Sequence, residues 1–258
     1  MPVIIDFSAP MSCFRIPLHH NYHRSFTLPP PTSVLGILGA ALGLDEPGID
    51  MWLRRARPRL GIGGKHNGGG NELMTVRKVG AGGVIKKPEE FSTILLRELR
   101  VDLICRLMVQ CDSDEFDRML VEAVNSPQYP VSAGPADFLA IMKAKWVNEF
   151  RQELTDRLHH CIAPGSLWGN ATIDAEAVKN ASLLETVAGP NNWNLPVAWQ
   201  LGKKGERLPA AFAPFTFLVS GVRLKEPISC VQTTLGDEGE PIAIPMLGPF
   251  DKWLISSA

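Results

Sequence analysis

The strongest constraint on the fold is a run of three prolines, residues 29–31, that leads through Thr32 and Ser33 into an apolar segment. Proline suits the entrance of a helix but not its interior, and a Thr or Ser hydroxyl can cap the free N–H groups there. We therefore predict a helix over Val34–Leu44. Three of its residues are glycines, and each costs about 1 kcal/mol relative to alanine. We expect close packing of this helix on a β-sheet to offset that cost.

Segments rich in β-branched and aromatic residues surround this helix and are separated by turn residues, as strands are. Four strands are expected at Val3–Ile16 (one strand or a bent pair), Arg57–Gly63, Arg100–Cys111 and Tyr129–Ala133. A second helix should follow a cap at Asp112 or Ser113. The order strand, helix, strand, insertion, strand, helix, strand predicts an α+β fold of the RRM or ferredoxin-like type, with two helices on one face of an antiparallel sheet.

The insertion spans about 64–92 and is rich in glycine around a β-capable Met74-Thr75-Val76. Such a segment is typical of a long hairpin that leaves the core. We expect a core domain at 1–145 that carries this hairpin.

A second region at 146–258 is expected to be less regular. Apolar residues recur every fourth position from Phe138 to Leu158, which predicts one long amphipathic helix or two abutting ones. Strand candidates follow at Phe215–Val222 and Ile228–Thr234, among many Gly and Pro turns. The C-terminal part should therefore be a long helix followed by a small β-containing region.

The charge of the chain is unevenly distributed although its formal net value is −1. Residues 52–107 hold 12 basic and 5 acidic side chains, whereas the flanking segments are both net acidic. A basic block in an acidic frame is typical of a phosphate-binding face in a protein that also has protein neighbours. Chance clustering of charges on a solvated surface is the alternative.

Five cysteines without a CxxC pair indicate reduced thiols rather than a disulfide framework or a zinc site. The histidines at 19, 20 and 23 lack a suitably spaced Cys or carboxylate, so no metal and no cofactor are expected. The N-terminus lacks the pattern of a signal peptide. The longest apolar stretch, Val34–Leu44, is too short for a membrane span of ~20 residues. We expect a cytoplasmic protein without a membrane partner.

The segment from Arg24 to Gly43 closely resembles the N-terminal signature of the CRISPR-associated Cas-five family. In that family an Arg-Ser-Phe strand end leads through prolines and Thr into a Gly/Ala-rich helix. Ser12–Pro17 looks like the entry to this signature, and Tyr129-Pro130 and Gly134–Ala140 are similar to a later strand and helix of the family. The resemblance covers roughly the first 145 residues.

The resemblance implies a RAMP-type RRM fold with a β-hairpin "thumb", in a type I-like Cascade ribonucleoprotein complex of antiviral defence. It further implies a non-catalytic subunit that binds the repeat-derived 5′ handle of the guide RNA. Its partners would be a Cas-seven-type backbone subunit and a large subunit, with target DNA contacted indirectly. The glycine-rich loop that RAMP proteins often carry near the C-terminus has no convincing counterpart after Phe217.

The candidate RNA-binding residues are cations and one aromatic residue in or near the basic block, together with a histidine. Arg clamps phosphate oxygens in bidentate fashion and Lys acts as a point charge, whereas Tyr can stack on an unpaired base. Phe14 and Phe26 could also stack but are expected in the core. The candidates are Arg15, Tyr22, His23, Arg24, Lys65, Arg77, Lys78, Lys86, Lys87 and Arg97.

Two other functions remain open from the sequence. One branch of the family processes guide precursors itself, and metal-independent RNA cleavage needs a general acid, a general base and a cation. Tyr22, Lys65 and His66 are the candidates for those roles, although no catalytic residue is expected in the leading hypothesis. The other alternative is an RRM-like module that binds only proteins.

Overall fold

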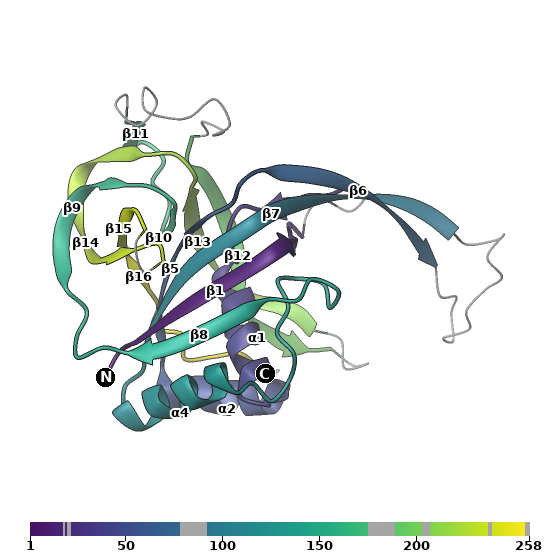
Figure 1. The fold of residues 1–258 in the computed structure, drawn as a ribbon, viewed down its shortest axis with the longest axis horizontal. Helices are drawn as coiled ribbons and strands as arrows, with labels where there is room; N and C mark the ends of the chain where they lie inside the picture. Colours follow the sequence, from purple (N-terminus) through teal and green to yellow (C-terminus); the bar gives the residue numbers. More distant parts are fainter. Residues whose placement is uncertain are drawn as a thin grey trace.

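The computed structural model describes residues 1–17, 19, 22–77, 92–174, 189–202, 207–236 and 239–255. Within this part of the chain, four antiparallel strands lie side by side in the order β8-β1-β7-β5 (Figure 1). They are β1 (Val3–Ser12), β5 (Arg59–Lys65), β7 (Ser92–Gln110) and β8 (Ile141–Trp146). The predicted α+β class and the antiparallel sheet are confirmed.

Strand β1 lies in the core, and its side chains alternate between two environments. Val3, Ile5 and Phe7 are fully buried against the helices, while the residues between them face the other side of the sheet. The facing positions on β7, among them Leu107 and Cys105, are buried in the same cluster. This period of two is the expected signature of a strand with one face on a core.

Three helices lie among the described residues: α1 (Pro31–Ala41), α2 (Glu46–Ala56) and α4 (Asp114–Asn125). The predicted first helix is present, but its N-cap is Pro30, so Thr32 and Ser33 lie within the first turn instead of capping it. A proline needs no N–H partner at this position, which allows the helix to begin earlier. The second predicted helix is α4, with Ser113 as its N-cap.

Helix α2 was not expected from the sequence. Its N-cap Asp45 accepts a hydrogen bond from the Gly48 N–H at 2.9 Å. A Cβ at Gly39 of α1 would lie 2.6 Å from the Ile49 side chain. At Gly39, therefore, the close approach is made by α2 rather than by the sheet.

The long helix predicted over Phe138–Leu158 is wrong. The chain instead forms β8, which pairs with β1, and then β9 (Gln152–Leu158). A spacing of four residues is also a multiple of the strand period of two, so the same apolar positions fall on one face of a strand. Strand β8 also takes the place of the fourth strand predicted at Tyr129–Ala133, where only one isolated bridge occurs, between Ser132 and Leu139.

The C-terminal part contains extensive strands and not the small irregular region that was expected. Three strands continue the main sheet beyond β5, namely β10 (Cys161–Pro164), β13 (Arg207–Leu218) and β12 (Asn191–Leu201), and β16 (Met246–Leu247) pairs with β5. A second sheet contains β9, β11 (Ala171–Ile173), β14 (Val222–Thr234) and β15 (Pro241–Ile244). The strand predicted at Ile228–Thr234 lies within β14. The one predicted at Phe215–Val222 is not a single strand, because Phe215–Leu218 ends β13, a turn follows, and Val222 begins β14. The division of the chain at residue 145 stays a prediction.

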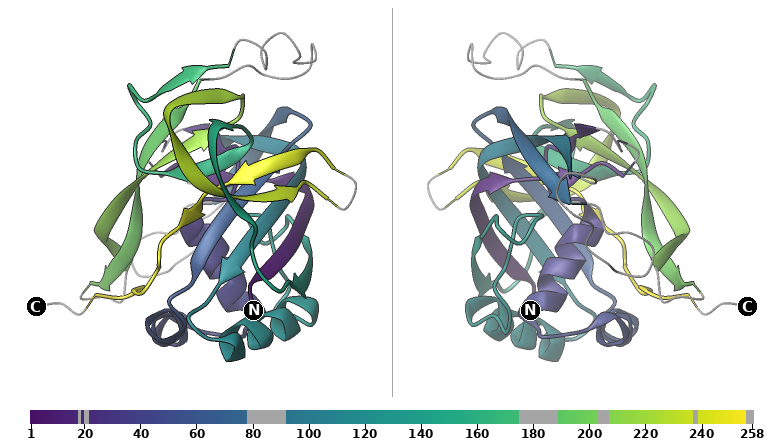
Figure 2. Two further views of the ribbon diagram at one scale, coloured as in Figure 1. Left: turned by 90° about the vertical axis from the view of Figure 1, so that its left-hand side faces the viewer. Right: turned by 90° about the vertical axis from the view of Figure 1, so that its right-hand side faces the viewer.

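The second sheet packs on the face of the main sheet that the helices leave open. A Cβ at Gly63 of β5 would lie 2.5 Å from Ile244, and Met108 of β7 belongs to the same buried cluster. Figure 2 shows the helices at the lower end of the molecule, with β14 and β15 above them. The glycines of β5 therefore allow two sheets to approach closely.

A two-stranded hairpin projects from the body where the insertion was predicted. Strand β6 (Gly69–Arg77) pairs with Ser92–Arg100, the first half of β7 (Figure 1). Residues 78–91, which connect β6 to β7 in the sequence, lie outside the described residues. Among the helices that the structure describes, none has the length and apolar character needed to cross a bilayer.

Candidate nucleic-acid interface

The first group of candidate residues lies at the root of the β6–β7 hairpin. Strand β3 (Tyr22–His23) runs parallel to β7 at Leu96 and Arg97. Next to it, β2 (Phe14–Arg15) pairs with β4 (Ser25–Phe26). The N-terminal candidates are therefore brought beside the hairpin by strand pairing with residues far away in the sequence.

Arg97 is buried at this root and is engaged by protein groups. Its side chain is 5% exposed, its Nε donates to Glu72 at 2.8 Å, and its Nη2 lies 3.5 Å from Asp137. The guanidinium also stacks over the Phe138 ring, 4.6 Å from its centroid. A buried cation held by two carboxylates stabilises the hairpin root and offers little surface to a phosphate.

A second arginine ties the hairpin to β4. Arg100 lies 2.9 Å from Glu98 and donates from Nη2 to the Ser25 carbonyl at 3.1 Å. The Ser25 N–H in turn donates to Glu98 at 2.9 Å. These contacts hold the strands beside the hairpin in a defined position, so side chains on β2 and β3 project from a fixed platform.

Two predicted cations remain at the surface of this platform. Arg15 is exposed, and it lies opposite Ser25 in the β2–β4 pair. Arg24 is half exposed and lies 3.9 Å from Glu98, a loose ion pair. Tyr22 donates from its hydroxyl to Asn71 Oδ1 at 2.8 Å, and His23 sits next to it on β3. Arg15 and Arg24 are thus exposed to an anionic ligand, which would compete with Glu98 for Arg24.

The two phenylalanines of this region belong to the core, as expected. Phe14 and Phe26 are both buried. Phe26 stacks on Phe217 at 4.9 Å between ring centroids and meets Trp193 edge-on at 5.4 Å. Neither ring is available to stack on a base.

Lys65 and His66 lie elsewhere, at the far end of β5, with two histidines that the sequence reasoning missed. Lys65 Nζ is 3.8 Å from Glu240, and His159 Nε2 is 3.6 Å from the same carboxylate. The His159 and His160 rings are 5.4 Å apart. Pairing of Cys161 with Gly63 brings these segments together, and no sequence pattern signals that pairing.

The His66 ring is partly buried and acts as an acceptor. Its Nδ1 accepts from the Gly68 N–H at 3.3 Å. Burial, and then the charge of Arg100, lowers the pKa of His66. This imidazole is therefore neutral in neutral solution and does not add to the positive charge of the region.

The three candidates for RNA cleavage do not converge. The Tyr22 hydroxyl donates to Asn71, which lies opposite Glu98 in the β6–β7 strand pair. Lys65 lies opposite Ile104 in the β5–β7 strand pair. Six residues of β7 separate these two positions, which corresponds to roughly 20 Å of strand. The Tyr22 hydroxyl is thus remote from Lys65 along β7.

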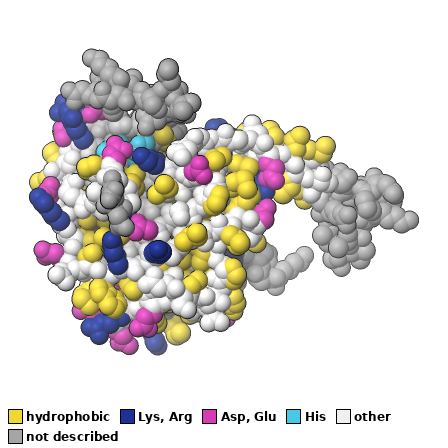
Figure 3. All heavy atoms as spheres, viewed as in Figure 1, with side chains coloured by type: hydrophobic (Ala, Val, Ile, Leu, Met, Phe, Trp, Pro, Cys, Tyr) yellow, Lys and Arg dark blue, Asp and Glu magenta, His cyan; other side chains and the backbone are white. Residues whose placement is uncertain are grey.

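The structure does not place the side chains of the remaining candidates. Arg77 is the last residue of β6, and its side chain is outside the described part of the structure. Lys78, Lys86 and Lys87 also lie outside it. On the face shown in Figure 3, Lys and Arg side chains are interspersed with Asp and Glu, and hydrophobic side chains follow the hairpin.

The model of one protein family, described as CRISPR-associated protein (Cas_Cas5), matches residues 3–159 of this chain. The chain belongs to this Cas5 family. The match covers more than half of the sequence and includes the signature at Arg24–Gly43, so the predicted family membership is confirmed. A search of curated proteins found no match.

Three solved structures show distant likeness to this chain. A chain described as "CRISPR RNA-guided surveillance complex" has a TM-score of 0.44 at 15% identity, over 54% of this chain and 59% of that chain. One described as "Crystal structure of Cas protein" has a TM-score of 0.37 at 16% identity, over 54% and 59%. A chain of a type III-B Cmr-beta complex bound to cognate target RNA has a TM-score of 0.41 at 11% identity, over 86% of both chains. The present chain thus spans about 59% of the first two structures.

Proposed function

We propose that this Cas5-family chain is a non-catalytic subunit of a CRISPR effector complex that binds the 5′ handle of the guide RNA. The observation that carries the proposal is the pair of exposed cations, Arg15 and Arg24, on a platform fixed by Arg97 and Arg100. Because the backbone that carries them is held in place, binding of a phosphate by these two guanidinium groups has to order only their side chains. Arg97 has a supporting role in this proposal.

The strand order β8-β1-β7-β5, with α1 and α4 against one face, supports an RRM or ferredoxin-like core. Both crossover connections then run on the helical side, as this type of fold requires. The projecting β6–β7 hairpin corresponds in this proposal to the thumb.

The hairpin is also the proposed contact with the neighbouring backbone subunit. Leu73 and Ile94 are 72% and 71% exposed on it. A two-stranded hairpin with exposed apolar side chains is only marginally stable alone, and such side chains are typical of protein contacts. A Cas-seven-type backbone subunit is the proposed occupant, and a large subunit completes the complex and reaches target DNA.

Binding of a repeat-derived RNA to the purified chain tests the RNA part of this proposal. Replacing Arg15 and Arg24 together by alanine should weaken binding and make its salt dependence shallower by about 1.4 in the log–log slope, for two lost phosphate contacts on a single strand. The matched control is Arg55→Ala with Arg118→Ala, two exposed cations on α2 and α4. Equal slopes for the two variants would contradict the proposal.

Incubation of the same RNA with the chain tests whether the subunit is non-catalytic. We expect no cleavage, because the Tyr22 hydroxyl is bound to Asn71 and is remote from Lys65. A site-specific product that disappears in the Tyr22/Lys65/His66 triple alanine variant would establish the endoribonuclease alternative instead.

A further inference from the structure

Glu98 and Arg100 lie on the same face of β7, because the two positions are two residues apart on a strand. Together they bind the backbone of Ser25 on β4. The Ser25 N–H donates to Glu98 Oε2 at 2.9 Å, and the Ser25 carbonyl accepts from Arg100 Nη2 at 3.1 Å. Glu98 Oε1 lies 2.9 Å from the same arginine nitrogen. The main-chain donor and acceptor of Ser25 are thus bound by two side chains that also bind each other.

Ser25 adjoins both exposed cations of the candidate RNA interface. Arg24 precedes it in the chain, and Arg15 lies opposite it in the β2–β4 strand pair. The Ser25 hydroxyl accepts from the Phe14 N–H at 3.0 Å and donates to the Phe26 carbonyl at 2.8 Å. A shift of the Ser25 backbone would therefore displace the backbone that carries both cations.

The short contacts of Glu98 are made to Ser25 and Arg100 and not to Arg24. The Glu98 side chain is 16% exposed, and the Arg24 Nε lies 3.9 Å from Oε2, the oxygen that already accepts from Ser25. An ion pair of this length with a half-exposed arginine contributes little to stability. Glu98 thus supports the strand beside Arg24 more than it neutralises the Arg24 charge.

The negative charge of Glu98 opposes RNA binding, and this makes its supporting role measurable. A phosphate bound at Arg24 would lie about 7 Å from the Glu98 carboxylate, and two charges at that distance in water repel by an energy worth roughly threefold in affinity. Salt weakens this repulsion further. Loss of the support acts in the opposite direction, and coupling between groups in direct contact is typically worth about tenfold. The loss of support therefore outweighs the loss of repulsion.

We propose that Glu98 is a positioning residue of the RNA interface. Together with Arg100 it fixes the backbone of Ser25, and through that backbone it fixes Arg15 and Arg24 for contact with RNA phosphates. The carboxylate promotes RNA binding although RNA repels its charge. This inference rests on the proposed function.

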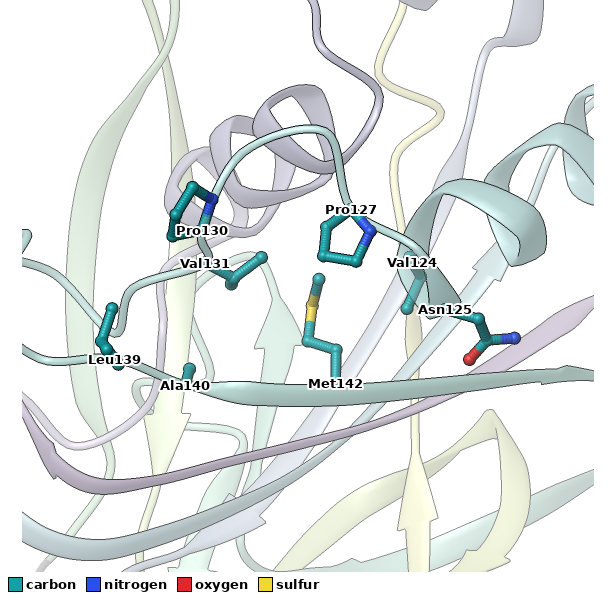
Figure 4. A pocket seen from close by; sticks show the side chains of 8 residues that line it. All are labelled: Val124, Asn125, Pro127, Pro130, Val131, Leu139, Ala140 and Met142. Carbon is teal, nitrogen blue, oxygen red and sulfur yellow. The ribbon is translucent and has the colours of Figure 1, made fainter.

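A control carboxylate is available on α4, which lies below the sheet and away from the hairpin in Figure 1. Glu122 is exposed on this helix. Val124 and Asn125 of the same helix line a cavity of about 250 Å³, into which the Met142 side chain points (Figure 4). The described residues that line this cavity carry no charge. We therefore expect no phosphate contact at this part of the surface.

Binding of repeat-derived RNA by Glu98→Ala tests the inference. We expect affinity about tenfold below that of the wild type and a shallower salt dependence, whereas Glu122→Ala, which removes the same charge, should leave the affinity unchanged. Glu98→Gln keeps an oxygen for the Ser25 N–H, so its affinity should lie between those of Glu98→Ala and the wild type. Unchanged or tighter binding by Glu98→Ala would overturn the proposal. If circular dichroism shows that Glu98→Ala does not fold, the sign of the change in Glu98→Gln decides.

A double-mutant cycle separates positioning from a general loss of structure. In a chain that already carries Arg15→Ala and Arg24→Ala, Glu98→Ala should cause no further loss of RNA affinity. An undiminished loss in that background would refute the positioning role. If the Arg15/Arg24 variant binds RNA as the wild type does, the proposed function and this inference both fail. If that variant loses RNA binding and Glu98→Ala does not, only this inference fails.

Discussion

Gly134 is expected to be among the glycines least tolerant of a side chain. The variant Gly134→Ala tests how closely the backbone at Gly134 approaches the backbone at Cys13. Its φ is +109°, and a Cβ there would clash with the backbone carbonyl of Cys13. Cys13 is held in place because its N–H donates to the Ala133 carbonyl at 3.0 Å. Relief of the clash therefore has to move the backbone that leads into Phe14 and Arg15 of β2.

The expected cost has two parts. A non-glycine residue with such a backbone conformation costs about 1–3 kcal/mol, and forcing an extra carbon into a closely packed site costs a further ~1–3 kcal/mol. We expect Gly134→Ala to lower the free energy of unfolding by about 3 kcal/mol or more. With an m value of about 3 kcal/mol/M, the midpoint of urea unfolding falls by roughly 1 M.

Gly36→Ala is the matched control in the same urea titration. Gly36 lies inside α1, and a Cβ there meets no atom within 4 Å. Alanine is favoured over glycine in a helix interior by up to about 1 kcal/mol, so this variant should be more stable than the wild type. If the free energy of unfolding of Gly134→Ala lies within about 1 kcal/mol of the wild-type value, the close approach of Gly134 to the Cys13 backbone is refuted.

Two further predictions concern titratable groups. Because burial lowers the pKa of His66, its contribution to stability is complete above the unfolded value of about 6.5 and is lost as the pH falls below it. His66→Gln should therefore flatten the decline in Tm between about pH 7.5 and about pH 5.5, and an unchanged profile would argue against burial of this ring. Burial also raises the pKa of Cys105 and Cys161, so both thiols should resist Ellman's reagent until urea unfolds the chain, and rapid labelling of either in the native chain would contradict their placement.

Local patterns were sufficient for the elements whose signal is contained in adjacent residues. The prolines before α1 and Ser113, the N-cap residue of α4, mark helix starts because the preference for such residues at a helix start depends on backbone geometry within one turn, although neither N-cap side chain makes a capping hydrogen bond. The alternation of β1 is equally local. By contrast, the apolar spacing from Phe138 to Leu158 fits a helix and a strand equally, and pairing of β8 with β1 selected the strand.

In the candidate site, too, the type of each residue follows from the sequence, whereas its exposure and its contacts depend on remote segments. Arg15, Arg24 and Arg97 have the same chemistry in the sequence, and only the fold separates them: Arg97 is enclosed by Glu72 and Asp137, which are distant along the chain. His159 and His160 approach Lys65 only because β10 pairs with β5.

The sequence by itself determined the family, the α+β class, the first helix and the set of cations from which an RNA contact can be drawn. It did so because capping, alternation and the Arg24–Gly43 signature are properties of neighbouring residues. The tertiary structure alone decided which of the candidate cations are exposed and that His159 lies beside Glu240. Those properties depend on burial and on partners contributed by remote segments, and a side chain's type does not specify which segment will pack against it.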